Sequence, residues 1–154
     1  MKKDSNKYIK EIKKSVLNYY KERLVSLIIF GSFSRGTYTP ESDIDLLLIV
    51  DGLPKRKMKR IEEFIDNVEE KIKNIPHYIS PIIKTPEEIS YGSPILFDMV
   101  TDSIIVYDKN DFFQRIIENL KIRFKELGSK KVFKGTRWYW ILKPDLKLGE
   151  IIEI

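Results

Sequence analysis

The stretch VSLIIFGSFSRGTYTPESDIDLLLIV, residues 25–50, contains two apolar runs joined by a short polar segment. Val25 to Phe30 and Ile44 to Val50 are rich in branched residues, which predicts two strands that are buried on both faces. The segment between them is rich in glycine, serine and threonine and predicts a loop with at most one short helical turn. Because this connection is too short for a helical crossover between parallel strands, a doubly wound nucleotide-binding fold is disfavoured.

Around these two strands, the rest of the chain alternates between helical and strand patterns. Apolar residues recur at helical spacing over residues 4–24, 55–74, 86–101 and 111–127, and Gly92 and Pro94 divide the third of these helices. Residues 78–83 and 104–107 predict two more strands, the first at a sheet edge or with a bulge because it contains Pro81. Residues 131–142 predict a hairpin around Gly135 and Thr136. This order predicts one α/β (α+β) domain over residues 1–154, with helices packed on a mixed sheet and a C-terminal helix and β-hairpin.

The composition limits the chemistry that the chain can perform. It has 154 residues, no cysteine and one histidine. Disulfides, a thiol nucleophile, sulfur-bound zinc, iron–sulfur clusters and sites with two histidines are therefore excluded. The net charge of +5 is only a weak indication of a polyanionic partner, because 23 acidic residues are spread among 28 basic ones. No apolar run reaches the roughly 18 residues of a membrane span, and the N-terminus has no signal-peptide core, so we expect a cytoplasmic protein with no membrane partner.

Asp43 and Asp45 stand at the start of the second predicted strand. Side chains two residues apart on a strand share a face, so both carboxylates are expected to point the same way while Ile44 and Leu46 enter the core. Two like charges held together destabilise each other unless a cation lies between them, and oxygen ligands favour Mg²⁺. The sequence therefore predicts a magnesium site at Asp43 and Asp45.

The segment before this acidic pair has the features of a phosphate-binding loop. Gly31 and Gly36 allow backbone N–H groups to approach an anion closely, and Ser32, Ser34 and Arg35 add further donors. The segment lacks both the Gly-Lys-Ser/Thr of the P-loop and the three-glycine spacing of dinucleotide folds. A phosphate loop followed about ten residues later by metal ligands predicts a single site for a polyphosphate and the metal that bridges it.

Gly31-Ser32, followed after a spacer by Asp43-Ile44-Asp45 between apolar residues, resembles the signature of the nucleotidyltransferase superfamily of DNA polymerase beta. Arg35-Gly36 and Ser42 resemble the small, minimal branch of that superfamily. The resemblance covers a core of about residues 22–108, which leaves residues 109–154 as a C-terminal extension. The chain is also similar to an archaeal group of predicted nucleotidyltransferases that ends in the same Trp-Tyr-Trp and Leu-Lys-Pro-Asp, here residues 138–140 and 142–145.

This resemblance implies the polymerase beta-like nucleotidyltransferase fold and a magnesium-dependent transfer reaction. Asp43 and Asp45 would be catalytic and would hold two Mg²⁺ ions. A nucleoside monophosphate, AMP in our prediction, would pass from a nucleoside triphosphate to a hydroxyl acceptor while pyrophosphate leaves. The acceptor is left open among a protein tyrosine, RNA and a small molecule. The residues that would bind the nucleotide are Gly31, Ser32, Arg35, Gly36 and Ser42.

The resemblance also implies a third carboxylate on the following strand, within Tyr78 to Ile83, and this strand has none. Ser80 stands in the expected position. The candidates that could replace the missing carboxylate are Asp98, Asp102, Asp145 and Glu150. We expect Asp145 to be catalytic, because Pro144 would fix it at the end of the hairpin. Because this carboxylate is missing, a further alternative is a domain that binds nucleotide or RNA without catalysing transfer.

Several residues have a structural interpretation beside a functional one. Arg35 is either a phosphate ligand or a surface ion-pair partner. The aromatic run of residues 138–140 either stacks on bases or covers a core. The basic run Lys55 to Arg60 opens a helix rich in glutamate and is interpreted as a solvated face. His77 has no partner in its own segment and is interpreted as a surface or packing residue.

A partner-binding function is the alternative to free-standing transfer. Minimal nucleotidyltransferase domains resemble the antitoxin half of two-gene toxin systems, in which the companion is a small helical ribonuclease with a tyrosine acceptor. Under this alternative the chain binds such a toxin-like protein. Under free-standing transfer, by contrast, the short C-terminal extension implies that the acceptor is docked by the extension itself or by a second subunit, as in a homodimer.

Overall fold

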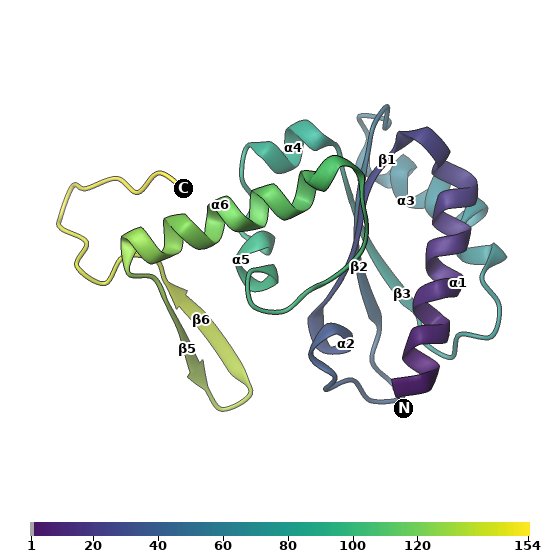
Figure 1. Ribbon diagram of the computed structural model, residues 1–154, viewed down its shortest axis with the longest axis horizontal. Helices are drawn as coiled ribbons and strands as arrows, with labels where there is room; N and C mark the ends of the chain where they lie inside the picture. Colours follow the sequence, from purple (N-terminus) through teal and green to yellow (C-terminus); the bar gives the residue numbers. More distant parts are fainter. Residues whose placement is uncertain (1) are drawn as a thin grey trace.

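The computed structural model describes residues 2–154, which form two β-sheets and six α-helices (Figure 1). The strands are β1 (Leu24–Phe30), β2 (Ile44–Val50), β3 (Ile79–Lys84), β4 (Ile104–Asp108), β5 (Lys130–Lys134) and β6 (Arg137–Ile141). The α-helices are α1 (Lys2–Tyr20), α2 (Gly31–Arg35), α3 (Lys57–Asn67), α4 (Pro86–Ser90), α5 (Ile95–Met99) and α6 (Phe112–Leu127). Three short 3₁₀ turns lie at Lys21–Arg23, Glu69–Lys71 and Lys109–Asp111.

The larger sheet has four strands in the order β3-β2-β1-β4, and β5 and β6 form a separate two-stranded sheet. β1 pairs antiparallel with β2 and with β4, whereas β2 pairs parallel with β3. The mixed sheet and the C-terminal hairpin confirm the predicted fold class. β3 lies at an edge, as Pro81 predicts, because a residue without an N–H group would interrupt the hydrogen-bond ladder inside a sheet.

Alternate residues of β2 supply two hydrophobic cores, one on each face of the sheet. Leu46 lies in a buried cluster with Phe64 of α3. Its neighbour Leu47 lies in a second cluster with Phe113 of α6. Figure 1 shows α1 and α3 on one side of the sheet, with α4, α5 and α6 on the other. A strand covered on both faces needs apolar residues at successive positions, which is the pattern that the sequence has.

Two helices are shorter than their apolar periodicity predicts. α1 ends at Tyr20 rather than at residue 24, because Lys21 has a φ of 51° and cannot continue a right-handed helix. α3 ends at Asn67 rather than at residue 74, and a 3₁₀ turn follows Val68, whose φ is −119°. The division of the third predicted helix is confirmed, since α4 and α5 are separate.

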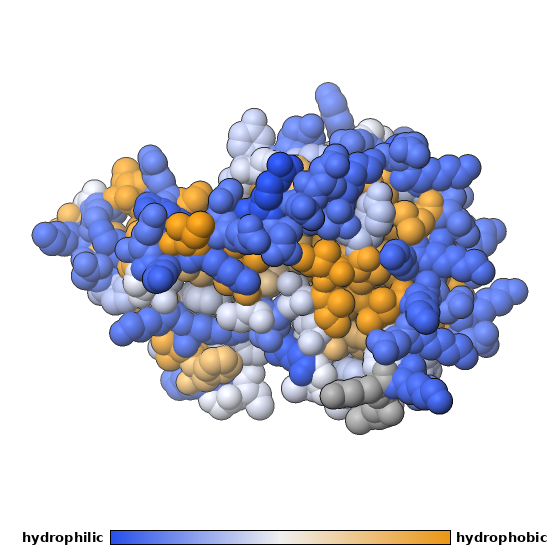
Figure 2. All heavy atoms as spheres, viewed as in Figure 1, coloured by the Kyte–Doolittle hydropathy of each residue, from blue (hydrophilic) through white to orange (hydrophobic). Residues whose placement is uncertain are grey.

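Charged side chains cover the outer surfaces of the helices. Figure 2 shows that hydrophilic residues dominate this face of the molecule and that hydrophobic residues gather between α1 and α6. No helix within residues 2–154 is both long and apolar enough to cross a bilayer.

The basic run that opens α3 is not solvated throughout, because Arg60 is only 4% exposed. Its guanidinium donates two hydrogen bonds to the Glu88 carboxylate, at 2.8 and 3.0 Å, and others to the backbone oxygens of Pro54 and Ile83. The prediction of a solvated face holds for residues 55–59, which are all exposed, and is wrong for Arg60. Arg60 joins α3 to β3 and α4 through residues that are distant in sequence, so the local pattern could not show it.

Glu88→Gln is expected to destabilise the fold in a pH-dependent way. Hydrogen bonds from Arg60 are the main reason why the pKa of Glu88 falls from 4.5 to about 2. Ionised Glu88 therefore stabilises the native state above about pH 4.5, and this stability is lost as the pH falls toward 2. Because Glu88 is partly exposed, we expect the free energy of unfolding to fall by about 1–2 kcal/mol at pH 7.

Urea unfolding of the wild type and of Glu88→Gln between pH 7 and pH 2.5 measures this difference. The difference should shrink as the pH falls below about 4.5, because Glu88 of the unfolded wild type then binds a proton while Glu88 of the folded protein stays largely ionised. The matched control is Glu87→Gln, which changes an exposed acid on the same turn of α4. A Glu88→Gln protein as stable as the wild type at pH 7 would contradict the prediction.

Candidate active site

Asp43 and Asp45 lie where β1 ends and β2 begins. Asp45 is the second residue of β2 and pairs with Phe30 of β1 and Ser80 of β3. Asp43 precedes the strand and is exposed. Alternation along β2 places Asp45 on the same face as Leu47, which is the face covered by α5 and α6. The register also puts Ser80 directly beside Asp45, at the position where the resemblance to the polymerase beta superfamily implies a carboxylate.

Gly31 brings the backbone of α2 against the Asp45 carboxylate. Gly31 has a φ of 73°, and a Cβ atom added there would lie only 2.3 Å from Oδ2 of Asp45. Any side chain would therefore clash with the carboxylate and would also be strained by the left-handed backbone. Gly36 has nearly the same φ, 72°, but no atom lies within 4 Å of its added Cβ. Close approach thus requires a glycine at position 31, whereas position 36 needs one only for its backbone conformation.

Hydrogen bonds hold the connection between α2 and β2. The Ser34 hydroxyl donates to the Gly31 carbonyl oxygen at 2.9 Å, and the Thr37 N–H donates to the Ser32 carbonyl oxygen at 3.0 Å. Ser42 accepts from the Thr39 N–H through its hydroxyl at 2.9 Å. Internal hydrogen bonds therefore fix the conformation of the segment that leads to Asp43. Ser42, which the sequence predicts to bind nucleotide, takes part in these hydrogen bonds.

His77 is a packing residue of this turn. Its Nδ1 donates to the Ser42 carbonyl oxygen at 2.8 Å. Its ring makes edge contacts with Tyr8, Phe33 and Tyr38, with ring centroids between 5.6 and 6.2 Å apart. The side chain thus ties β3 and α1 to the residues just before Asp43, in line with the packing interpretation.

The electrostatics of the acidic pair favour a cation. Burial raises the pKa of Asp45, the neighbouring charge of Asp43 raises it further, and the Arg35 guanidinium lowers it. An ionised Asp45 is therefore unfavourable in the folded protein until positive charge lies beside it. Arg35 supplies part of that charge.

The donor set fits Mg²⁺ better than a metal held by protein alone. Among residues 2–154, no group of three or more His, Cys, Asp or Glu side chains is placed to hold a metal ion. Mg²⁺ is usually bound by one or two carboxylates together with water and substrate phosphates. Asp43 and Asp45 match that arrangement, so a phosphate-bearing ligand would complete the coordination.

A cavity of about 340 Å³ lies in front of Asp45. It brings together Ser32 and Arg35, which the sequence predicts to bind nucleotide, and Asp45, which it predicts to bind metal. Asp43 and Ser42 lie outside its lining. The residues that line the cavity are Phe30, Gly31, Ser32, Arg35, Asp45, Asp98, Asp102 and Trp138.

The additional acids of this cavity are Asp98 and Asp102, not Asp145. Asp98 lies in α5, and Asp102 follows that helix. Asp145 is exposed in the segment after β6 and does not line the cavity. Glu150, another candidate, is engaged by Lys143 and the Lys147 N–H. Pro144 therefore does not direct Asp145 into the site. In the sequence, the only feature that links Asp98 to Asp102 is their four-residue spacing.

The C-terminal hairpin is attached to these two acids. Trp138 and Trp140 both donate their indole N–H groups to Oδ1 of Asp98, at 2.7 and 3.1 Å. The ammonium group of Lys131 lies 3.6 Å from Oδ2 of Asp102. The core-covering interpretation of the aromatic run holds for Trp140, which packs on Phe124 of α6, whereas Trp138 lines the cavity.

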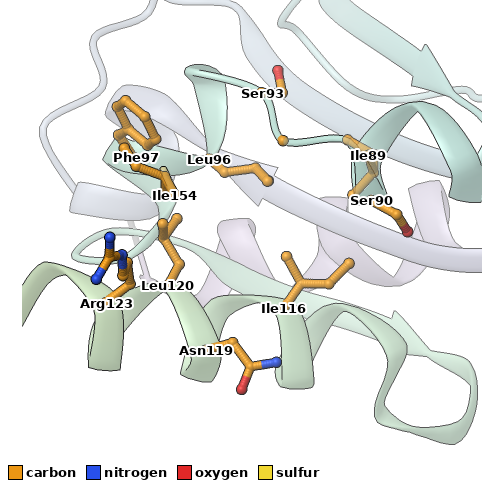
Figure 3. A pocket seen from close by; sticks show the side chains of 11 residues that line it. Ile89, Ser90, Ser93, Leu96, Phe97, Ile116, Asn119, Leu120, Arg123 and Ile154 are labelled. Carbon is orange, nitrogen blue, oxygen red and sulfur yellow. The ribbon is translucent and has the colours of Figure 1, made fainter. Parts of the chain in front are cut away.

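A second cavity, of about 220 Å³, lies between α4, α5 and α6 (Figure 3). Ile89, Leu96 and Leu120 give it an apolar wall, and Arg123 lies at its rim. No carboxylate side chain lines it. It therefore lacks the groups that the acidic cavity offers for metal-assisted chemistry.

Two comparisons with known protein sequences match most of this chain. A family model described as a nucleotidyltransferase domain matches residues 9–124. A protein of Methanocaldococcus jannaschii named "putative protein adenylyltransferase" is 33% identical over 137 residues, which cover 88% of this chain and 92% of that protein. Both matches include the segment from Gly31 to Asp45 and the strands around it.

Two solved structures share the fold at low sequence identity. One chain, from a crystal structure of a toxin–antitoxin with AMP-PNP, is 18% identical with a TM-score of 0.51, and the match covers 78% of this chain and 92% of that one. The other is the spectinomycin adenyltransferase AAD(9) from Enterococcus faecialis with ATP and spectinomycin. It is 17% identical with a TM-score of 0.53, and the match covers 79% of this chain and 66% of that one.

Gly31→Ala is expected to lower stability more than Gly36→Ala. Both substitutions put a side chain on a backbone with φ near 70°, which costs about 1 kcal/mol. Only Gly31→Ala also pushes Asp45 out of place, so we expect a total loss of about 2–3 kcal/mol in unfolding free energy. Urea unfolding measures both losses, and Mn²⁺ titration should show weaker binding only for Gly31→Ala. Equal effects of the two variants would argue against the close contact.

Asp45→Asn is expected to stabilise the metal-free protein at neutral pH. The raised pKa means that the native state favours neutral Asp45, so its contribution to stability is lost as the pH rises above the ordinary value. Asparagine stays neutral and avoids that loss. Thermal unfolding in EDTA should therefore give a higher midpoint for Asp45→Asn than for the wild type.

Addition of Mg²⁺ together with a non-hydrolysable ATP analogue should reverse the order. A ligand that binds the native state raises the midpoint, and only the wild type keeps both carboxylates. The matched control is Asp51→Asn, which removes an exposed acid just after the other end of β2 and should change neither midpoint. A lower midpoint for Asp45→Asn in EDTA would refute the electrostatic argument.

Proposed function

The chain belongs to the nucleotidyltransferase family, and we propose that it transfers adenylate from ATP to a hydroxyl group of an acceptor protein. The observation that carries the proposal is the contact of Gly31 with Asp45. It joins a glycine turn and a carboxylate pair at one end of the sheet, next to a cavity of about 340 Å³. Such a cavity has the size typical of small-molecule sites.

The residues of α2 would bind the triphosphate. Ser32 offers a hydroxyl donor and Arg35 a guanidinium, and both line the cavity together with the Gly31 backbone. Guanidinium groups bind phosphate oxygens through two parallel N–H donors. We therefore assign the phosphate tail to this side of the cavity, beside Asp45.

Asp43 and Asp45 would hold the metal. When bound there, Mg²⁺ would neutralise phosphate charge and favour the departure of pyrophosphate. The two residues contribute negative charge at one end of the sheet, with Asp45 anchored by β2 and Asp43 free to adjust because it is exposed. Arg35 limits the repulsion between them.

The proposed reaction is an in-line displacement at the α-phosphorus. The acceptor hydroxyl oxygen forms a bond to that phosphorus, the bond to the bridging oxygen of the β-phosphate breaks, and pyrophosphate leaves with the electron pair. The hydroxyl proton passes to a carboxylate of the cavity or to water. Ser80 cannot accept it as a carboxylate would, so Asp98 and Asp102 are the acids that extend the site beyond Asp45.

The choice of ATP and of a protein acceptor rests on the M. jannaschii relative. That relative covers most of both chains at 33% identity, and its name specifies protein adenylylation. The two solved structures contain AMP-PNP or ATP, which is consistent with an adenine nucleotide as donor. The cavity itself supports only the more general assignment of a nucleoside triphosphate.

Asp43→Asn and Asp45→Asn are each expected to reduce transfer about 100-fold or more, because each removes charge that stabilises the metal-bound phosphates. The assay incubates the full chain with Mg²⁺, ATP labelled at the α-phosphate and a protein extract, and measures labelled protein and pyrophosphate release. Asp51→Asn is the control and should retain wild-type activity.

The fate of the label identifies the acceptor. Label that resists ribonuclease and is lost on proteolysis supports a protein acceptor, whereas the opposite result assigns RNA. Label found on a single small helical ribonuclease would select the antitoxin alternative. ATP binding without label or pyrophosphate release under any of these conditions would refute transfer and leave a nucleotide-binding domain.

A further inference from the structure

Arg35 presents its guanidinium to the cavity without a hydrogen-bond partner. Within residues 2–154, this group makes no hydrogen bond and no salt bridge, although Arg35 is half-buried and its charge acts on nearby Asp45. Its contact is with the Trp138 ring, whose centroid lies 4.7 Å from the guanidinium carbon. A guanidinium that lies over an aromatic ring is held through its face, and its N–H groups remain available at its edge.

The Trp138 ring is itself held by several contacts. Its indole N–H donates to Oδ1 of Asp98 at 2.7 Å, which fixes the ring's rotation. The Lys131 ammonium lies 4.8 Å from the ring centroid and is tied to Thr101 by a hydrogen bond of 3.1 Å. The side chain of Lys131 is only 10% exposed. The hairpin therefore presents Trp138 to α2 as a fixed surface.

These contacts differ between the two tryptophans of β6. Both donate to the same oxygen of Asp98, but Trp140 packs on Phe124, with ring centroids 4.9 Å apart. Trp138 is the one that lines the cavity and lies under Arg35. Trp140 thus anchors the hairpin, while Trp138 faces the site.

We propose that Trp138 is a positioning residue, which holds the Arg35 guanidinium in the cavity so that its free N–H groups bind the phosphate tail of the nucleoside triphosphate. This inference rests on the proposed function. A long, flexible arginine loses conformational freedom when it binds phosphate. Because the Trp138 ring orders Arg35 before the ligand arrives, binding loses less freedom and becomes tighter.

Stacking of a base on Trp138 is the competing role for this ring. The ring already has two cations within 5 Å of its centroid, Arg35 at 4.7 Å and Lys131 at 4.8 Å. Both carry positive charge, which attracts phosphate rather than a neutral base. The two roles differ in the part of the nucleotide that they recognise, so ATP and adenosine distinguish them.

The test is a double-mutant cycle on nucleotide affinity. Equilibrium dialysis with Mg²⁺ measures binding of AMP-PNP and of adenosine to the full chain. Arg35→Met should weaken AMP-PNP binding about tenfold or more, and Trp138→Leu about three- to tenfold. If Trp138 acts through Arg35, the double variant binds AMP-PNP as Arg35→Met does, with no further loss.

Two milder variants separate the role of the ring from that of the indole N–H. Trp138→Phe keeps a ring under Arg35 and should fall between the wild type and Trp138→Leu. Trp140→Phe loses the equivalent bond to Asp98 but does not touch Arg35, so its AMP-PNP affinity should stay within about twofold of the wild type. Thermal unfolding shows whether each variant folds. If Trp138→Leu does not fold, the AMP-PNP affinities of Trp138→Phe and Trp140→Phe test the inference.

Three results would overturn the inference alone: wild-type affinity of Trp138→Leu or Trp138→Phe for AMP-PNP, losses that multiply in the double variant, or an equal loss for adenosine, which would assign base stacking. Each of these leaves AMP-PNP binding by the wild type intact. Absence of AMP-PNP binding by the wild type itself would overturn both this inference and the proposed function.

Discussion

The contact between the Gly31 backbone and the Asp45 carboxylate constrains the rest of the molecule. A Cβ atom at Gly31 would lie 2.3 Å from the carboxylate, so the chain can turn closely over Asp45 only through a glycine. The antiparallel register that pairs Phe30 with Asp45 makes this approach possible. A slip of one residue would turn Asp45 to the other face of the sheet and separate it from α2. The register of β1 and β2 thus defines the site as well as the core.

This contact also places negative charge where the fold alone would favour a neutral group. Burial and Asp43 both make ionised Asp45 unfavourable. The strand tolerates it because the positions from Leu46 to Val50 are fully buried and apolar, and each buried side chain of this size contributes about 1.5–3 kcal/mol. The excess charge that weakens the metal-free fold is the same charge that attracts a cation, so stability and cation binding are coupled through one side chain.

Features that are local in sequence could be predicted, and contacts between distant segments could not. The strands follow from continuous apolar runs, and the acidic pair beside Gly31 from a spacing within one connection. The solvated-face prediction is wrong for Arg60, because its neighbours in the basic run are exposed while its own partner, Glu88, belongs to another helix. Asp98 joins the cavity through bonds from Trp138 and Trp140, some 40 residues away, which no periodicity reveals. Local patterns report which face is apolar, but not which polar groups meet across the fold.

The hairpin and the cavity depend on each other physically. An isolated two-stranded hairpin is marginally stable in water, so β5 and β6 need the contacts that they make with α5 and α6. Those contacts are the indole bonds to Asp98 and the packing of Trp140 on Phe124. The family match ends at residue 124, before the hairpin begins. Loss of docking would therefore disorder the hairpin and, at the same time, remove Trp138 from beside Arg35. A segment outside the matched region thus supplies one wall of the site, and it can do so only while it is folded against the family core.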